Sequence, residues 1–204
     1  MRRRPYENVN GSMFMNVACF AILLFAFLQT RAVFEIDIWP GEGRPVFEAA
    51  SNELPLREVP SSASRIRTVT VTPGQRLSYD DTRYQTTRPG RIEVLSAAYV
   101  EGRLIGNVTQ LSREKYYSDE FGHVKISVMA GQKVTYLQYR AEGSCFVRID
   151  DNIIDASPCP IADTGKFKVV LDPRTEGWIH VVGGDSTGWL LISEANAKLV
   201  GREF

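Results

Sequence analysis

Short segments of alternating side chains, separated by turn residues, constrain the fold of this chain more than any other feature. In residues 66–72 an arginine and two valines alternate with threonines, and a Pro73-Gly74 turn follows, as at the end of a strand. Similar segments span residues 91–100, 104–110, 123–129, 133–139, 145–149, 167–171, 178–182 and 188–192. Short strands at this spacing predict an all-β fold, an antiparallel small barrel or sandwich.

Two parts of the chain depart from this pattern. Residues 33–65 contain four prolines and a serine-rich stretch, which predict an extended Pro-rich arm or linker. Within it, residues 33–39 alternate weakly and are able to add a strand to a sheet edge. Residues 193–200 predict a short C-terminal helix, with Ser193 as its N-cap.

The N-terminal region is typical of an export signal. Three arginines at positions 2–4 precede an uncharged segment, residues 13–28. As a helix this segment spans roughly 24 Å, less than the roughly 30 Å of a bilayer core, which favours a signal peptide cleaved after Ala32. The alternative is a retained anchor that tethers the chain to the inner membrane. Either way, residues 1–32 are expected to be a signal peptide or membrane anchor, and residues 33–204 to be exported, free in the periplasm or anchored.

The exported part contains two of the three cysteines, Cys145 and Cys159. An even pair in an oxidising compartment predicts a disulfide. Closing a loop of about 15 residues contributes roughly 3 kcal/mol in the chain-entropy model. The alternative is a pair of buried free thiols.

The overall charge argues against one class of partner. The chain has 24 Lys and Arg residues against 24 Asp and Glu residues. A nucleic-acid binder that neutralises phosphates needs an excess of basic residues, so we expect no nucleic-acid partner. Residues 65–103 contain seven arginines and four acids. They predict a mildly basic face for an acidic partner, or ordinary solvated surface.

Metal and cofactor motifs are not found in the sequence. The two histidines, His123 and His180, and the cysteine spacing match no zinc motif. Residues 150–155 contain three aspartates and an asparagine but lack the calcium-loop spacing, so a polar turn is expected there. We expect neither a metal site nor a cofactor.

One segment matches a hydrolase pattern without its context. Gly184-Asp185-Ser186-Thr187-Gly188 fits G-x-S-x-G, but a nucleophile elbow needs a helix after it, and residues 189–192 predict a strand. A hairpin turn explains the glycines. No catalytic residue is therefore expected.

The same hairpin carries a resemblance to a known family. Gly177-Trp178-Ile179-His180-Val181 leads through a Gly183-Gly184-Asp185 turn to Thr187-Gly188-Trp189-Leu190. A tryptophan strand, a tight turn and a Gly-Trp-aliphatic strand resemble the last hairpin of a bacterial SH3-like (SH3b-type) domain. The resemblance covers roughly residues 131–192. It implies an SH3-like β unit in residues 126–204, with residues 66–125 as a second, tandem β-rich unit or as part of one fused barrel.

The resemblance implies a binding module, because such domains in exported bacterial proteins hold cell-wall peptide or protein partners. Aromatic side chains give large contact area at low conformational cost. We therefore expect Tyr136, Tyr139, Trp178 and Trp189 to line the ligand groove, with core packing as the alternative for the tryptophans. The predicted function is a non-enzymatic interaction protein of the cell envelope. The alternative is a peptidoglycan-acting hydrolase, or an inhibitor of one, whose reactive groups meet only on folding.

Overall fold

The computed structural model describes residues 33–37, 43–105, 116–118, 122–183 and 187–203. These residues form three antiparallel sheets, none of them closed, and a short 3-10 helix at Pro160–Ala162. The predicted all-β, antiparallel class is therefore confirmed. No helix in the described ranges has the length and apolar character needed to cross a membrane. The predicted signal or anchor, residues 1–32, lies outside those ranges.

Many strands follow the expected segments. In chain order the strands are β1 (Phe34–Ile36), β2 (Arg44–Ala49), β3 (Glu53–Arg57), β4 (Ile66–Thr70), β5 (Tyr79–Arg88), β6 (Gly90–Val94), β7 (Ala98–Ile105), β8 (Tyr116–Ser118), β9 (His123–Val128), β10 (Lys133–Tyr139), β11 (Cys145–Ile149), β12 (Asn152–Ala156), β13 (Phe167–Leu171), β14 (Arg174–Val181), β15 (Gly188–Leu191) and β16 (Ala197–Glu203). The expected strand 91–100 is wrong, because residues 95–97 separate it into β6 and β7. Of the expected strand 104–110, residues 104 and 105 end β7 and the rest lies outside the described ranges.

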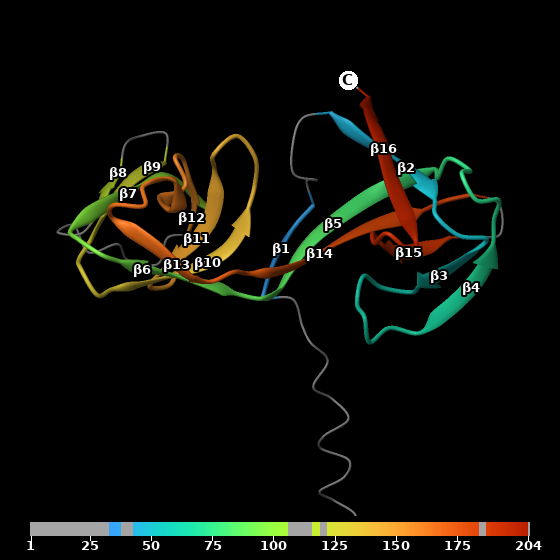
Figure 1. Cartoon of the computed structure of the whole chain (residues 1–204), viewed down its shortest axis with the longest axis horizontal. Helices are drawn as coiled ribbons and strands as arrows, with labels where there is room; N and C mark the ends of the chain where they lie inside the picture. Colours follow the sequence, from blue (N-terminus) through green and yellow to red (C-terminus); the bar gives the residue numbers. More distant parts are fainter. Residues whose placement is uncertain (1–32, 38–42, 106–115, 119–121, 184–186, 204) are drawn as a thin grey trace, which may run out of the picture.

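Two lobes are joined by the long strands β5 and β14 (Figure 1). These two strands pair with each other from Arg88 opposite Arg174 to Tyr79 opposite Val181. The chain between them, residues 90–171, builds one lobe, which we call the inserted lobe. Residues 43–82 and 177–203 build the other, which we call the split lobe because its two halves are far apart in the sequence.

The inserted lobe folds around one apolar core. Its eight-stranded sheet has the order β13-β6-β10-β11-β12-β7-β9-β8. Alternate side chains turn inward along β6 and β9; in β9 these are Val124, Ile126 and Val128. The Cys145–Cys159 disulfide lies in the same core, with both cysteines buried. The predicted disulfide is thereby confirmed.

The split lobe contains two strands, β2 and β3, that lie in the segment expected to be an extended arm. The six-stranded sheet has the order β1-β5-β14-β15-β3-β4, and β2 pairs with β16. The prediction of an extended arm over residues 33–65 is wrong for β2 and β3. Leu54 and Leu56 alternate with Pro55, so both leucines enter the core while the proline stays on the outer face.

The strand β1 closes the junction between the lobes. It pairs with β5 at the edge of the six-stranded sheet, as expected for residues 33–39. The Phe34 ring packs on Phe146 of the inserted lobe, with 5.1 Å between ring centroids, and Leu137 completes the cluster. The Thr86 hydroxyl on β5 donates a hydrogen bond of 2.7 Å to the Leu137 carbonyl. The strands β1 and β5 thus contact the inserted lobe through both apolar and polar groups.

The C-terminal helix predicted for residues 193–200 is wrong. A hydrogen-bonded turn forms instead, in which the Ser193 carbonyl accepts hydrogen bonds from the amides of Asn196 and Ala197. The chain then enters β16, where Ala197 is buried in the split-lobe core and pairs with Ala49. Tertiary pairing with β2 overrides the local helical preference.

The sheets also cross the expected unit boundary. Residue 125 falls inside β9, so the division between 66–125 and 126–204 cuts a strand. The hairpin β14-β15 pairs with β5 and β3 in the six-stranded sheet. It belongs to a different sheet from the strands of residues 131–171, with which the resemblance grouped it.

Candidate functional site

Two of the four expected groove residues are core residues. Tyr136 is 4% exposed in the inserted-lobe core, and burial raises the pKa of its hydroxyl to about 12. Trp178 is fully buried in the other sheet, with the Arg57 guanidinium 6.0 Å from its ring centroid. Neither ring offers contact area to a ligand, so both serve packing instead.

The other two candidates are accessible but lie on different sheets. Tyr139, on β10, is 47% exposed, and its hydroxyl accepts a hydrogen bond from the Gly143 amide. Trp189, on β15, is partly exposed between His180 and Arg83, whose groups lie 5.1 and 5.6 Å from the indole centroid. The structure therefore does not assemble one aromatic groove from the four residues.

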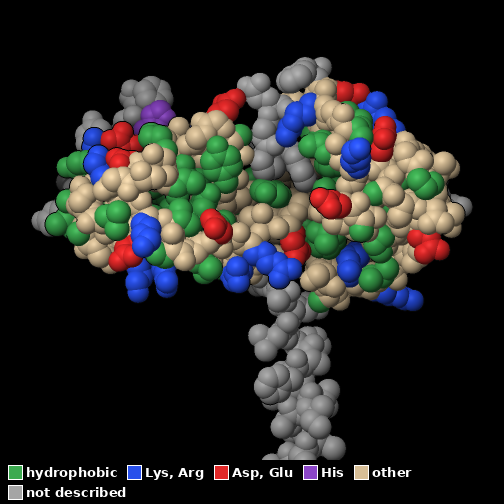
Figure 2. All heavy atoms as spheres, viewed as in Figure 1, with side chains coloured by type: hydrophobic (Ala, Val, Ile, Leu, Met, Phe, Trp, Pro, Cys, Tyr) green, Lys and Arg blue, Asp and Glu red, His purple; other side chains and the backbone are tan. Residues whose placement is uncertain are grey.

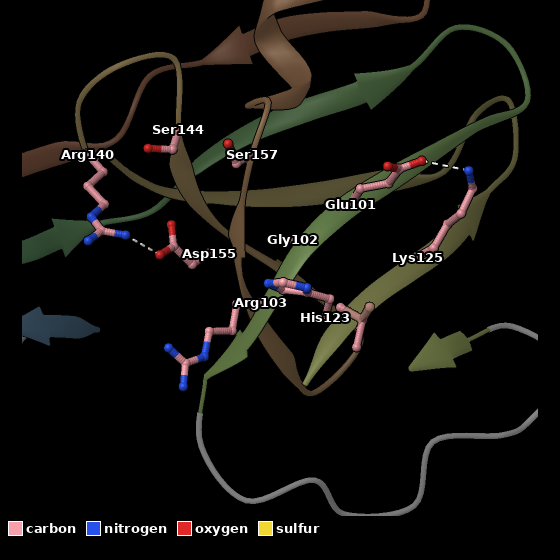
Figure 3. Close-up of a pocket in the computed structure, with 10 residues that line it drawn as sticks. Glu101, Gly102, Arg103, His123, Lys125, Arg140, Ser144, Asp155 and Ser157 are labelled. Atoms are coloured by element: carbon pink, nitrogen blue, oxygen red, sulfur yellow. Dashed lines mark hydrogen bonds and ion pairs between the residues drawn. The ribbon is translucent and has the colours of Figure 1, made fainter. Parts of the chain in front are cut away.

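Charged side chains of both signs are spread over the visible face of both lobes (Figure 2). Charges of both signs also line a hollow on the inserted lobe. A pocket of about 550 Å³ opens on the inserted lobe over β7, β9, β12 and the turn that follows β10 (Figure 3). We call it the inserted-lobe pocket. Sequence analysis did not predict it.

One wall of this pocket comes from paired residues of β7 and β9. Glu101 lies opposite Lys125, and Arg103 opposite His123. These four side chains are exposed, whereas Val100 on β7 and Val124 on β9 are buried, so the four point away from the core. The Lys125 ammonium lies 2.7 Å from a Glu101 carboxylate oxygen. This hydrogen bond raises the pKa of Lys125 above its ordinary value.

The opposite wall is a second ion pair, between Arg140 and Asp155. Figure 3 shows it across the pocket from Glu101 and Lys125, with His123 between the two pairs. Asp155 uses Oδ2 for the arginine. Its Oδ1 is buried and has no hydrogen-bond partner among the described residues. One acceptor of this carboxylate is therefore unused.

Gly102 shapes the floor. A Cβ atom built on Gly102 would lie 2.2 Å from the backbone oxygen of Asp155. The strands β7 and β12 approach each other too closely for any side chain at this position. Glycine at this position allows β7 and β12 to lie close together, so that both strands contribute residues to the pocket.

The disulfide holds the rim of the pocket. Ser144 and Ser157, which line the rim, lie beside Cys145 and close to Cys159 in the sequence. The Cys159 amide donates a hydrogen bond of 2.6 Å to the Gly143 carbonyl. The covalent bond and this hydrogen bond tie the turn after β10 to the segment after β12.

The charge pattern determines what the pocket is able to bind. Arg103, Lys125 and Arg140 stand against Glu101 and Asp155, so three positive charges minus two negative charges leave +1 when His123 is neutral. Both carboxylates are paired with a cation. Arg103 forms no ion pair within the described part of the chain. The arrangement suits a ligand that brings a carboxylate to Arg103.

Two further expectations concern turns. Asp150 and Asp151 form the turn of the β11-β12 hairpin, as predicted, and Asp150 has a φ of 52°. Residues 184–186 lie outside the described ranges, and the predicted strand after them is β15.

Comparison of the chain with protein-family models, with curated proteins and with solved structures returns no match. The proposal of a function therefore rests on the chain's own sequence and structure.

Proposed function

We propose that the chain is an exported, non-enzymatic binding module of the cell envelope, and that the inserted-lobe pocket holds a polar segment of its protein or cell-wall peptide partner. The observation that carries this proposal is Arg103, an exposed guanidinium of the pocket without an ion pair in the described part, whereas both carboxylates of the pocket are already paired. A peptide that ends in a free carboxylate offers a matching acceptor for this guanidinium.

The compartment is supported by two features of the chain. The disulfide is compatible with an oxidising environment outside the cytoplasm. The arginines at positions 2–4 and the uncharged residues 13–28 favour export, with a membrane tether as the alternative to cleavage. A partner in the same compartment is a protein or peptidoglycan.

We also propose that any SH3-like unit is the split lobe. The hairpin β14-β15 that carries the resemblance packs its Ile179 and Leu190 against Leu54 and Leu56 in one core. In this proposal the inserted lobe interrupts the SH3-like unit between β5 and β14.

The test is a titration of the purified chain with a short cell-wall-type peptide that ends in a free carboxylate, followed by amide NMR. We expect shifts at β7, β9 and β12, and about tenfold weaker binding of the same peptide after amidation, because a charge-assisted hydrogen bond is lost. Arg103→Gln should weaken binding by a similar factor.

Arg91→Gln is the matched control, because Arg91 is an exposed arginine of the same lobe outside the pocket. It should leave the affinity unchanged. Equal binding of both peptides, or shifts confined to other strands, contradicts the proposal. Cleavage of the peptide during the titration would instead support the hydrolase alternative.

A further inference from the structure

The split lobe ends in a strand with an open edge. In the described part of the chain, β4 is the last strand of the six-stranded sheet and pairs only with β3. Its residues are exposed except for Val69, which is partly buried. Natural edge strands are usually protected by proline, lysine or a bulge. The segment 66–71 contains no proline, lysine or glycine.

The register shows which backbone groups face outward. The Val71 amide donates a hydrogen bond of 3.0 Å to the Asn52 carbonyl on the β3 side. In an antiparallel pair this role recurs at every second residue, so Arg67 and Val69 also face β3. The N–H and C=O groups of residues 66, 68 and 70 therefore point away from the sheet. Pro55 has no N–H, and its place opposite Thr68 agrees with this assignment.

A basic pocket adjoins one end of this edge. It has a volume of about 470 Å³ and is lined by Arg57, Arg65, Arg67 and His180, with Glu58 as its acid. Three arginines minus one glutamate leave +2 when the histidine is neutral. We call it the β4 pocket.

The arginines of the β4 pocket keep their charge available. Arg57 donates to the carbonyls of Ser62 and Ser64, and Arg67 donates to the carbonyl of Thr187. These bonds orient the side chains without neutralising them. Arg65 is exposed and has no hydrogen bond or ion pair within the described residues. Two of the seven arginines of residues 65–103, Arg65 and Arg67, thus lie beside an open backbone edge.

We propose that β4 is a docking site for an extended acidic segment of a partner protein, which adds a strand to the six-stranded sheet and brings carboxylates to Arg65 and Arg67. The backbone of such a segment pairs with residues 66, 68 and 70. Ile66, which is 50% exposed, offers apolar contact. This surface lies on the other lobe from the inserted-lobe pocket, so the proposal stands independently of that pocket.

Charge favours an acidic segment over a second copy of the chain as the partner of β4. Two β4 strands paired with each other would gather Arg65 and Arg67 of both copies along one seam, and the like charges would repel. A nucleic acid would satisfy the arginines but has no peptide backbone to complete the sheet.

The first experiment uses the isotope-labelled full chain and a short capped peptide of alternating valine and glutamate. We expect the amides of Ile66, Thr68 and Thr70 to shift most and to gain protection from hydrogen exchange. A matched peptide that is N-methylated on alternate residues keeps its charge but loses the donors that pair with β4. It should bind about tenfold more weakly.

Two variants and a control distinguish the contribution of backbone pairing to binding from the contribution of charge. Thr68→Pro removes an outward N–H from an edge position that tolerates proline, so it should abolish binding. Arg65→Gln should weaken binding about threefold at low salt. Arg76→Gln is the control, because Arg76 lies on the same lobe in an ion pair with Glu203. It should leave the affinity unchanged.

Several outcomes would overturn the proposal. These are no shift at β4, equal binding of the N-methylated peptide, and equal binding of a peptide with lysine in place of glutamate. An oligonucleotide that shifts the same amides would indicate general polyanion binding, and concentration-dependent shifts without peptide would indicate a second copy. If Thr68→Pro lowers the melting temperature, the two peptides on the wild-type chain decide the question.

Discussion

Gly102 and Tyr136 show how single positions are fixed by their surroundings in the inserted lobe. Gly102 lies where the backbones of β7 and β12 leave no space for a Cβ atom. Tyr136 points into the core and is kept neutral by burial. Gly102 is constrained sterically and Tyr136 electrostatically. Gly102 should therefore respond to an added side chain, and Tyr136 to a change of pH.

Gly102→Ala should lower the free energy of unfolding by roughly 1–3 kcal/mol, because the backbone of Asp155 must move to admit the methyl group. Chemical denaturation measures the change. Gly201→Ala is the control, since a Cβ atom there meets nothing within 4 Å. An unchanged stability of Gly102→Ala would mean that β7 and β12 separate easily.

Tyr136 should make the fold sensitive to alkaline pH. Its pKa is about 12 in the folded chain against an ordinary 10.0, so ionisation favours the unfolded state. The stability that the buried, neutral Tyr136 contributes to the fold is fully present below pH 10 and is lost as the pH rises through about 12. Tyrosinate absorbance should show a late step that Tyr136→Phe removes. The variant should also lose less stability than wild type between these pH values.

Among the elements, β9, β10, β11, β13 and β15 coincide closely with segments predicted from alternation. Alternation is visible in the sequence because one face of each strand is buried. The strands β2 and β3 were missed because their prolines indicated a linker, whereas the leucines beside Pro55 carried the signal. The inserted-lobe pocket was missed because it depends on the register of β7 with β9, two strands whose separate sequences do not specify it.

The disulfide is the element-scale restraint that was predicted correctly. Replacing Cys145 and Cys159 together by alanine should lower the free energy of unfolding by about 2–4 kcal/mol, because the closed loop of the unfolded chain is released. Hydrogen exchange should accelerate around the pocket rim, at Ser144 and Ser157. Reductant should reproduce both effects in wild type and leave the variant unaffected. A variant with unchanged rim exchange would show that the backbone hydrogen bonds suffice.

For the whole molecule, the junction decides whether the two lobes behave as one unit. It consists of Phe34 on β1 against Leu137 and Phe146 of the inserted lobe, with the Thr86 hydroxyl of β5 bonded to the Leu137 carbonyl. The strand β1 thus links β5 to the inserted lobe. The polar and apolar contacts together predict a fixed relation between the lobes.

Phe34→Ala should weaken this relation, because a largely buried ring at the junction is removed. We expect a loss of roughly 2–4 kcal/mol and separate unfolding transitions for the lobes, measured by calorimetry. Val33→Ala is the control, since Val33 is 41% exposed. A single, unshifted transition in Phe34→Ala would mean that β5 and β14 alone couple the lobes.

The insertion of one lobe into the other also sets an order for folding. Residues 43–82 pair with β14, β15 and β16, which are synthesised after the whole inserted lobe. The inserted lobe has all its strands in one continuous stretch, so its contacts close earlier and over shorter loops. For an exported chain, the unpaired first part of the split lobe would be exposed to folding helpers and proteases until β14, β15 and β16 emerge.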